Sequence, residues 1–198
     1  MAKDTYHHGD LANALVEAAA KAVDAGGAEA VSLRDLAASL GVSRAAPYRH
    51  FVDRDALLAA VAARGFEELA GIYRAADASG GDGPARVRKA MRDYMAFAWR
   101  RPGLHRLMFE SDLLRREPIP PVLARPYQDT YEALWGTLTN AYPDAPEAWR
   151  KRRRVTMLST VVGFLVLDEA GRFTPEWAQP LTREDMIEAV IDAAVGAP

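Results

Sequence analysis

Apolar side chains recur every three or four residues along most of the chain, which is the spacing of one buried face of an α-helix. From Asp10 to Ala25 this pattern predicts a first helix, and the Gly26-Gly27 pair supplies its end. Runs of alternating Val, Ile and Thr, which would indicate strands, are scarce, whereas Ala, which favours helix more than any other residue, is abundant. The pattern therefore predicts an all-helical (all-α) protein.

Two short helices are expected next. Ser32 precedes the periodic segment 33–39 and suits the N-cap position, and Gly41 ends that helix in a tight turn. Ser43 then caps a third helix over 44–51, RAAPYRHF, although the proline inside it removes one helical hydrogen bond. The first three helices therefore lie close together in the sequence, before residue 52.

Longer helices follow. Asp53 caps a helix that runs to Asp77, about 24 residues and roughly 36 Å long, and Thr182 with Asp185 forms a capping box for the last helix. Further helices are expected over roughly 84–101, 103–115, 126–141, 146–170 and 182–195. The predicted organisation is an N-terminal three-helix head at 1–52, a connecting helix at 53–77 and a helical body at 78–198.

Two short capped helices joined by a tight turn form a helix-turn-helix, whose second helix lies in the major groove of DNA. On that helix Arg44 is a planar donor suited to guanine edges, and Ala45 and Ala46 are small enough to approach thymine methyl groups. The helix N-termini at Ser32 and Ser43 also attract phosphate. The expected DNA-binding residues are Ser32, Arg34, Ser43, Arg44, Ala45, Ala46, Tyr48, Arg49, His50 and Arg54.

The arrangement SLRDLAASLGVS, then YRHF, then DRDALL resembles the TetR family of bacterial transcriptional regulators, over residues 11–58. The run VVGFLVLDEAGRF at 161–173 is similar to the body of the WHG-type branch of that family. The resemblance implies a DNA-binding regulator, and specifically a repressor that a small-molecule effector releases from a palindromic operator. It implies base contacts from Arg34, Arg44, Ala45 and Ala46, and backbone contacts from Tyr48, His50 and Arg54.

The body carries no catalytic or phosphate-binding motif, and a chain without cysteine has neither a thiolate metal site nor a cysteine nucleophile. We therefore expect no enzyme activity, no cofactor and no metal. Stripes of Met and aromatic residues on the predicted body helices fit either an ordinary core or a pocket for an apolar or aromatic small molecule. The candidate ligand-binding residues are Tyr94, Met95, Ala98, His105, Met108, Tyr131 and Trp135.

The last two long helices carry more apolar side chains than one small body needs to bury, which predicts a homodimer. The expected interface residues are Val155, Leu158, Val162, Leu165, Val166, Ile187, Val190 and Ile191. The basic run RKRRR at 150–154 begins the first of these helices, and we interpret it as a solvated face rather than a nucleic-acid site.

Composition narrows the class of protein only a little. With 49% apolar and 26% charged residues and a net charge of −2, the 198-residue chain has an ordinary globular composition that does not by itself indicate a nucleic-acid partner. Its longest apolar stretch, at 161–167, is too short to span a membrane, and its first residues are polar, so we expect a cytoplasmic protein. Two alternatives stay open: a helical small-molecule binder or enzyme without DNA binding, and an architectural DNA binder without an effector.

Overall fold

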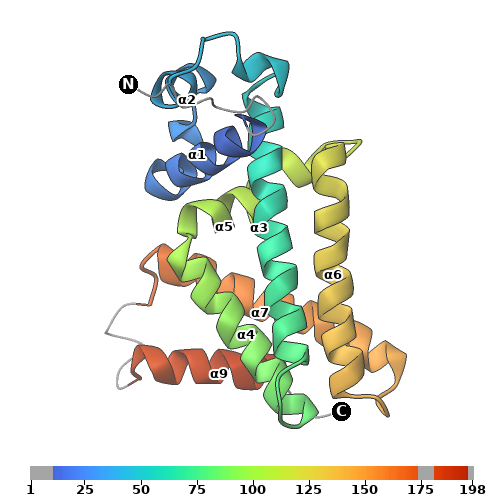
Figure 1. The fold of residues 1–198 in the computed structure, drawn as a ribbon. Helices are drawn as coiled ribbons and strands as arrows, with labels where there is room; N and C mark the ends of the chain where they lie inside the picture. The colour runs from blue at the N-terminus through green and yellow to red at the C-terminus, as the bar shows by residue number, and fades with distance from the viewer. Residues whose placement is uncertain (1–10, 174–180, 196–198) are drawn as a thin grey trace. The chain divides into compact units, whose positions relative to one another are not determined.

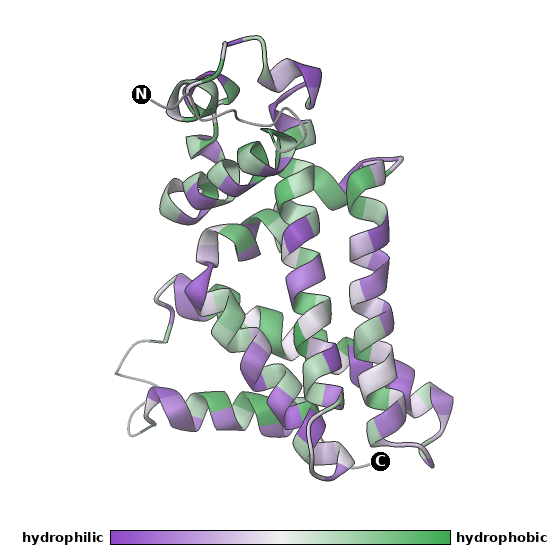
Figure 2. Ribbon diagram, in the orientation of Figure 1, coloured by the Kyte–Doolittle hydropathy of each residue, from purple (hydrophilic) through white to green (hydrophobic). Residues whose placement is uncertain are grey.

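The computed structural model describes residues 11–173 and 181–195, and within these ranges the chain folds into helices and turns without a strand (Figure 1). This confirms the all-helical prediction. The chain divides into two compact units. The head unit comprises the described residues up to Glu67 together with Arg101–Gln128, and the body unit comprises Glu68–Arg100 together with the described residues from Asp129 onward. Figure 2 shows polar and apolar residues interleaved along the helices, as expected for amphipathic helices.

The head unit is built from three helices, three short turns of 3₁₀-helix and the ends of two longer helices. Its elements are α1 (Leu11–Gly26), η1 (Ala28–Ala30), α2 (Leu33–Ser39), η2 (Pro47–Arg49), the first part of α3 (Arg54–Asp77), α5 (Pro102–Phe109), η3 (Asp112–Arg115) and the first part of α6 (Pro121–Ala141).

Helix α1 ends where the glycine pair predicts. Leu15 and Val23 on its apolar face are fully buried. Gly27 adopts a φ of 74°, a left-handed conformation that side chains with a Cβ rarely adopt, and its N–H donates to the carbonyl of Val23 at 2.7 Å. The chain therefore leaves the helix at this point.

Helix α5 packs against α1 without a side chain between the two backbones. A Cβ atom on Gly103 would lie 2.0 Å from the carbonyl oxygen of Val23, so only glycine allows this approach. Beside this contact, Arg101 Nε donates to Asp24 Oδ2 at 3.0 Å. Helices α1 and α5, which lie far apart in the sequence, are thus in direct contact within the head unit.

The helix predicted over 103–115 is wrong as a single element, because α5 ends at Phe109 and a separate 3₁₀ turn covers Asp112–Arg115. Ser111 causes the interruption. Its hydroxyl donates to the carbonyl of Leu107 at 2.6 Å and accepts from the N–H of Leu113 at 3.4 Å, so it ends one element and caps the next.

The body unit contains α4 (Gly83–Arg100), α7 (Glu147–Glu169) and α9 (Arg183–Val195), with the later parts of α3 and α6. The predicted capping box of α9 is confirmed. The N–H of Thr182 donates to Asp185 Oδ2 at 2.8 Å, and the N–H of Asp185 donates to Thr182 Oγ1 at 3.1 Å.

Charged side chains connect α4 to α9. Arg88 pairs with Glu188 and Asp192, and Arg92 pairs with Glu184 and Glu188. Each of these side chains is partly exposed, so each individual ion pair contributes little to stability. Because the pairs recur along both helices, they set how α4 and α9 align.

The basic run at 150–154 is more than the solvated face expected from the sequence, since Lys151 pairs with Glu147 and three further members contact other parts of the body unit. Arg150 donates to the carbonyl of Tyr142 at 2.9 Å, just beyond the end of α6, and Arg153 donates to the carbonyl of Ala193 at 3.0 Å in the last turn of α9. Arg154 lies over the ring of Trp135 at 5.5 Å. Arg150 and Arg153 therefore satisfy backbone carbonyls at the C-terminal ends of α6 and α9, where cations are favoured.

Candidate nucleic-acid interface

Helix α2 and the turn after it form as the sequence predicts. The hydroxyl of Ser32 accepts from the N–H of Asp35 at 3.3 Å, and Leu33 and Leu36 are buried on the apolar side of the helix. Gly41 has a φ of 67°, which confirms that the turn requires glycine at this position. The chain reverses direction here and leads into the recognition segment, residues 42–50.

The helix predicted over 44–51 is wrong, because within this segment only Pro47–Arg49 form a helical turn, and that turn is 3₁₀. Pro47 has no N–H to bond the carbonyl of Ser43, which instead accepts from the N–H of Ala46, three residues on, at 2.9 Å. The pyrrolidine ring of Pro47 is itself buried. The recognition segment is therefore a series of tight turns instead of a regular α-helix.

The structure gives the predicted DNA-binding residues different exposures. Ser32, Ala46 and Arg54 are half-buried. The exposed members of the set are Arg34, Ser43, Arg44, Ala45, Tyr48, Arg49 and His50. Tyr48 is 56% exposed, which is high for a large aromatic side chain and leaves its hydroxyl accessible. The head unit thus presents most of the set to solvent on α2 and the recognition segment.

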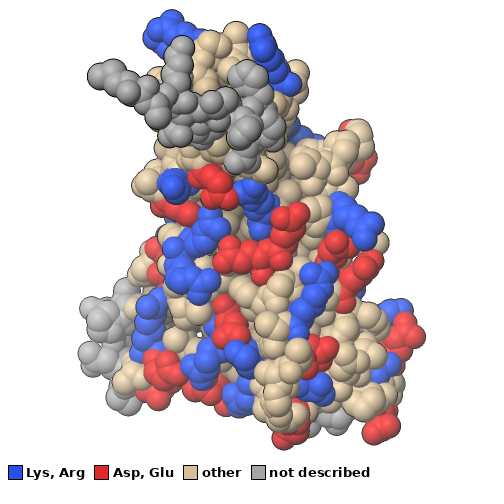
Figure 3. Space-filling model, viewed as in Figure 1, with Lys and Arg blue, Asp and Glu red and all other residues tan. Residues whose placement is uncertain are grey.

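The guanidinium groups of three arginines of this set, Arg34, Arg44 and Arg49, have no hydrogen bond or ion pair with any described residue. Elsewhere in the described chain many arginines are paired, as Arg64 is with Glu17 and Arg116 with Asp55. Figure 3 shows basic groups near the tip of the head unit, and it shows acidic and basic groups intermingled lower on the same face. Unpaired guanidinium groups are free to neutralise phosphates or to read bases.

Arg54 behaves differently from these three. Its Nε donates to the carbonyl of Val31 at 3.0 Å, and its Nη2 donates to the carbonyl of Ala28 at 2.5 Å. The guanidinium thus ties the first turn of α3 to the segment between α1 and α2. Its backbone partners lie far from it in the sequence, so no local pattern could have indicated them.

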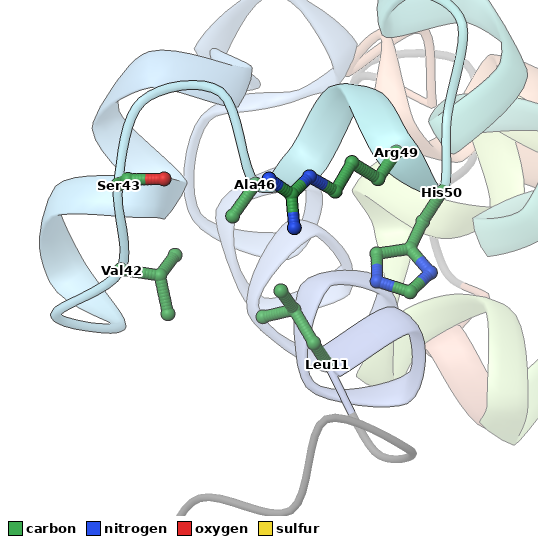
Figure 4. A pocket seen from close by; sticks show the side chains of 6 residues that line it. All are labelled: Leu11, Val42, Ser43, Ala46, Arg49 and His50. Carbon is green, nitrogen blue, oxygen red and sulfur yellow. The ribbon is translucent and has the colours of Figure 1, made fainter.

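A cavity of about 430 Å³ lies beside the recognition segment (Figure 4). Its lining residues are Leu11, Val42, Ser43, Ala46, Arg49 and His50. Four of these belong to the predicted DNA-binding set, but Leu11 and Val42 were not expected there, because the cavity arises from the packing of α1 against the recognition segment and not from a local motif.

The predicted effector-binding residues lie in both units. In the body unit Tyr94, Met95 and Ala98 are buried on α4, and Tyr131 and Trp135 are half-buried on α6. Burial raises the pKa of Tyr94 well above its ordinary value, and the neighbouring Tyr73 and Tyr131 raise it further. Tyr94 therefore stays neutral near neutral pH.

The other two predicted effector residues, His105 and Met108, are buried on α5 in the head unit. Met108 fills the space that a side chain at Gly65 would need, since a Cβ there would lie 2.4 Å from its sulfur atom. Burial, with a smaller contribution from Arg106, lowers the pKa of His105 to about 4. Its ring lies 4.9 Å from that of Phe109.

The predicted dimer residues separate into two groups. Leu165, Ile187 and Ile191 are buried within the body unit, where the chain's own helices cover them. Val155, Leu158, Val162, Val166 and Val190 remain at least partly exposed on α7 and α9. An apolar groove of about 390 Å³ lies beside them, lined by Thr160, Gly163, Phe164, Leu167, Phe173, Leu181, Met186, Ala189 and Val190.

Within the described ranges, no helix combines the length and apolar character needed to cross a membrane. The same residues bring together no group of three or more His, Asp or Glu side chains that could hold a metal ion.

Comparison with known proteins agrees with the helix-turn-helix head and the helical body described above. Residues 15–61 match the family of bacterial regulatory proteins, tetR family, and residues 87–194 match the tetracyclin repressor-like C-terminal domain. No curated protein matches the sequence. A solved protein of unknown function from Rhodococcus sp. RHA1 is 26% identical over 97% of each chain, with a TM-score of 0.81.

The TetR family transcriptional regulator PfmR from Thermus thermophilus shares the fold. It has a TM-score of 0.64 and 20% identity over 91% of this chain and 96% of its own. The family matches cover the helix-turn-helix and more than half of the chain in the body. The chain therefore belongs to the TetR family and is a DNA-binding transcriptional regulator, not an enzyme.

Proposed function

We propose that this protein is a repressor that binds a palindromic operator as a homodimer and leaves it when a small molecule binds. The observation that carries the DNA-binding part is the set of unpaired, exposed arginines Arg34, Arg44 and Arg49 on α2 and the recognition segment. As an operator lies on the chromosome, the protein acts in the bacterial cytoplasm.

Two classes of contact follow from the side chains. Arg34 and Arg44 read guanine edges, and Ala45 and Ala46 lie against thymine methyl groups. The phosphate backbone is bound by the N-terminus of α2 at Ser32 and by the side chains of Ser43, Tyr48, Arg49 and His50. Arg54 supports these contacts as a positioning residue, because its guanidinium already bonds two backbone carbonyls.

A second copy of the chain covers the apolar face of α7 and α9. Val155 is 61% exposed and Val166 39% exposed, which leaves a strip of apolar surface along α7. Two-fold symmetry places two heads on half-sites about 34–36 Å apart, or a multiple of that distance. The groove between α7 and α9 continues this strip and belongs to the same interface.

The effector is apolar or aromatic. Among the described residues, no Asp, Glu, Lys or Arg is buried, so the interior offers no charged group to neutralise a charged ligand. Its proposed contacts in the body unit are Tyr94, Met95, Ala98, Tyr131 and Trp135. By linkage, the effector weakens DNA binding by the same factor as DNA weakens effector binding.

Selection of duplexes from a random pool, followed by anisotropy titrations at several salt concentrations, tests the proposal. The wild type is expected to enrich a palindrome, and Arg44→Gln to weaken its binding about 10-fold or more with relaxed preference at one base position. Arg172→Gln is the control, because Arg172 is an exposed arginine of the body unit. Failure to enrich any palindrome, or equal losses for Arg44→Gln and Arg172→Gln, would contradict the proposal.

A further inference from the structure

The cavity beside the recognition segment has two chemically different walls. Leu11 at the start of α1 and Val42 supply apolar surface, whereas Ser43, Arg49 and His50 supply a hydroxyl, a guanidinium and an imidazole. In Figure 4 Arg49 and His50 point into the space that Leu11 and Val42 border. Its volume of about 430 Å³ is within the usual range for small-molecule pockets, roughly 300–1,000 Å³.

The polar wall favours an anion. The guanidinium of Arg49 has no partner among the described residues, and none of the described residues that line the cavity is a carboxylate. A carboxylate or phosphate monoester can therefore accept two parallel hydrogen bonds from the guanidinium, with His50 and Ser43 as further donors. An uncharged ligand would form no such charge-assisted pair with the guanidinium.

The apolar wall favours a ligand larger than the anionic group alone. Leu11 is already buried, but Val42 is only half-buried, so a DNA phosphate at the polar wall would leave Val42 uncovered. Burying apolar surface contributes roughly 25 cal/mol per Å², and a short chain or a single ring attached to the anion would cover this side chain. The chemistry of the cavity thus fits a molecule with one charged end and one apolar end.

We infer that the head unit holds a second ligand site, which binds a small amphipathic anion at Arg49, His50 and the wall formed by Leu11 and Val42. This inference rests on the proposed function in one respect, namely that Ser43, Arg49 and His50 also contact DNA. Ligand and DNA then need the same side chains. The anion excludes DNA by competition, unlike an effector in the body, which acts at a distance.

Direct binding to the full-length protein tests the site without DNA. Three probes separate the two walls: 4-phenylbutyrate has both the charge and the apolar part, 4-phenylbutanol lacks the charge, and inorganic phosphate lacks the apolar part. We expect 4-phenylbutyrate to bind at least 10-fold more tightly than either of the others. In two-dimensional amide NMR spectra it is expected to shift the signals of Leu11 and of residues 42–50.

Two substitutions and a control variant test what each wall of the cavity contributes to binding. Arg49→Gln is expected to weaken 4-phenylbutyrate binding about 10-fold, whereas Arg44→Gln, which removes an unpaired head arginine outside the cavity lining, is expected to leave it unchanged. Val42→Thr keeps the shape of the side chain but adds a hydroxyl, and it is expected to weaken 4-phenylbutyrate several-fold without changing phosphate binding. Equal effects of Arg49→Gln and Arg44→Gln would overturn the inference.

Other results would also overturn it. If phosphate binds as well as 4-phenylbutyrate, the cavity is only a phosphate contact of the DNA interface; if 4-phenylbutanol binds equally well, the charge has no role.

Competition between the anion and DNA is tested separately at constant sodium concentration. The half-saturation concentration for DNA is expected to rise in proportion to added 4-phenylbutyrate, and a rise that levels off would contradict competition. If the ligand signals map to the cavity while the protein binds no DNA, the site stands and the proposed function fails.

Discussion

From the close contact between Gly103 and the backbone of Val23 we predict that Gly103→Ala lowers the stability of the protein. In Gly103→Ala the new Cβ would lie 2.0 Å from the Val23 carbonyl oxygen, and this distance must grow to about 3.4 Å before the contact becomes ordinary. The obstacle is a backbone atom that already accepts from the N–H of Gly27, so α5 must shift away from α1. We expect a loss of about 2–3 kcal/mol, equivalent to roughly 5–10 °C in melting temperature for a chain of this length.

Thermal unfolding followed by circular dichroism measures this loss. Gly71→Ala is the matched control, because Gly71 lies within α3 and a Cβ there meets nothing within 4 Å. That change is expected to be neutral or to stabilise the protein by up to about 1 kcal/mol, since Ala favours helix more than Gly. If Gly103→Ala melts at or above the wild-type temperature, the close approach of α5 to α1 is not needed for stability and the reasoning is refuted.

Three further predictions concern other parts of the chain. Arg54→Ala is expected to lower the free energy of unfolding by about 2–3 kcal/mol in urea titrations because two carbonyls lose a charged donor, and a loss no larger than that of Arg172→Ala would contradict this role. His105 has a pKa of about 4 in the folded protein, below its unfolded value, so the folded state resists protonation and its stability falls by on the order of 3 kcal/mol as the pH drops from about 6.5 to about 4. A parallel pH profile in His105→Phe would exclude this cause. Val155→Glu is expected to shift sedimentation velocity from dimer to monomer, whereas Val122→Glu, at an exposed valine of the head unit, leaves the dimer intact; equal behaviour would contradict the α7–α9 interface.

Much of the fold could be predicted from the sequence because its determinants are local. Gly41 ends α2 through its own backbone conformation, and the bonds between Thr182 and Asp185 span only three residues. The helix that begins near Asp53 runs to Asp77 as its apolar spacing predicts. Within the recognition segment, Pro47 signals a missing hydrogen bond, but the sequence pattern does not reveal that the whole helix gives way to a turn.

The features that the sequence could not reveal all depend on distant partners. Arg54 was expected to bind phosphate, yet it bonds carbonyls 23 and 26 residues away, and Arg153 bonds a carbonyl 40 residues away in α9. The cavity next to the recognition segment likewise needs both Leu11 and Val42. Periodicity identifies which face of a helix is buried, but it does not identify the residues that cover that face.

The head unit is discontinuous in the sequence, since residues 68–100 belong to the body unit and Arg101–Gln128 then complete the head unit. During synthesis, α1 therefore cannot acquire its contact with Gly103 until α5 has left the ribosome, well after the helix-turn-helix itself has been made. The same order constrains engineering. A chimeric regulator that takes its DNA-binding head from this protein needs residues 101–128 together with residues 11–67, because a cut at residue 52 would leave the α5-facing backbone of α1 uncovered.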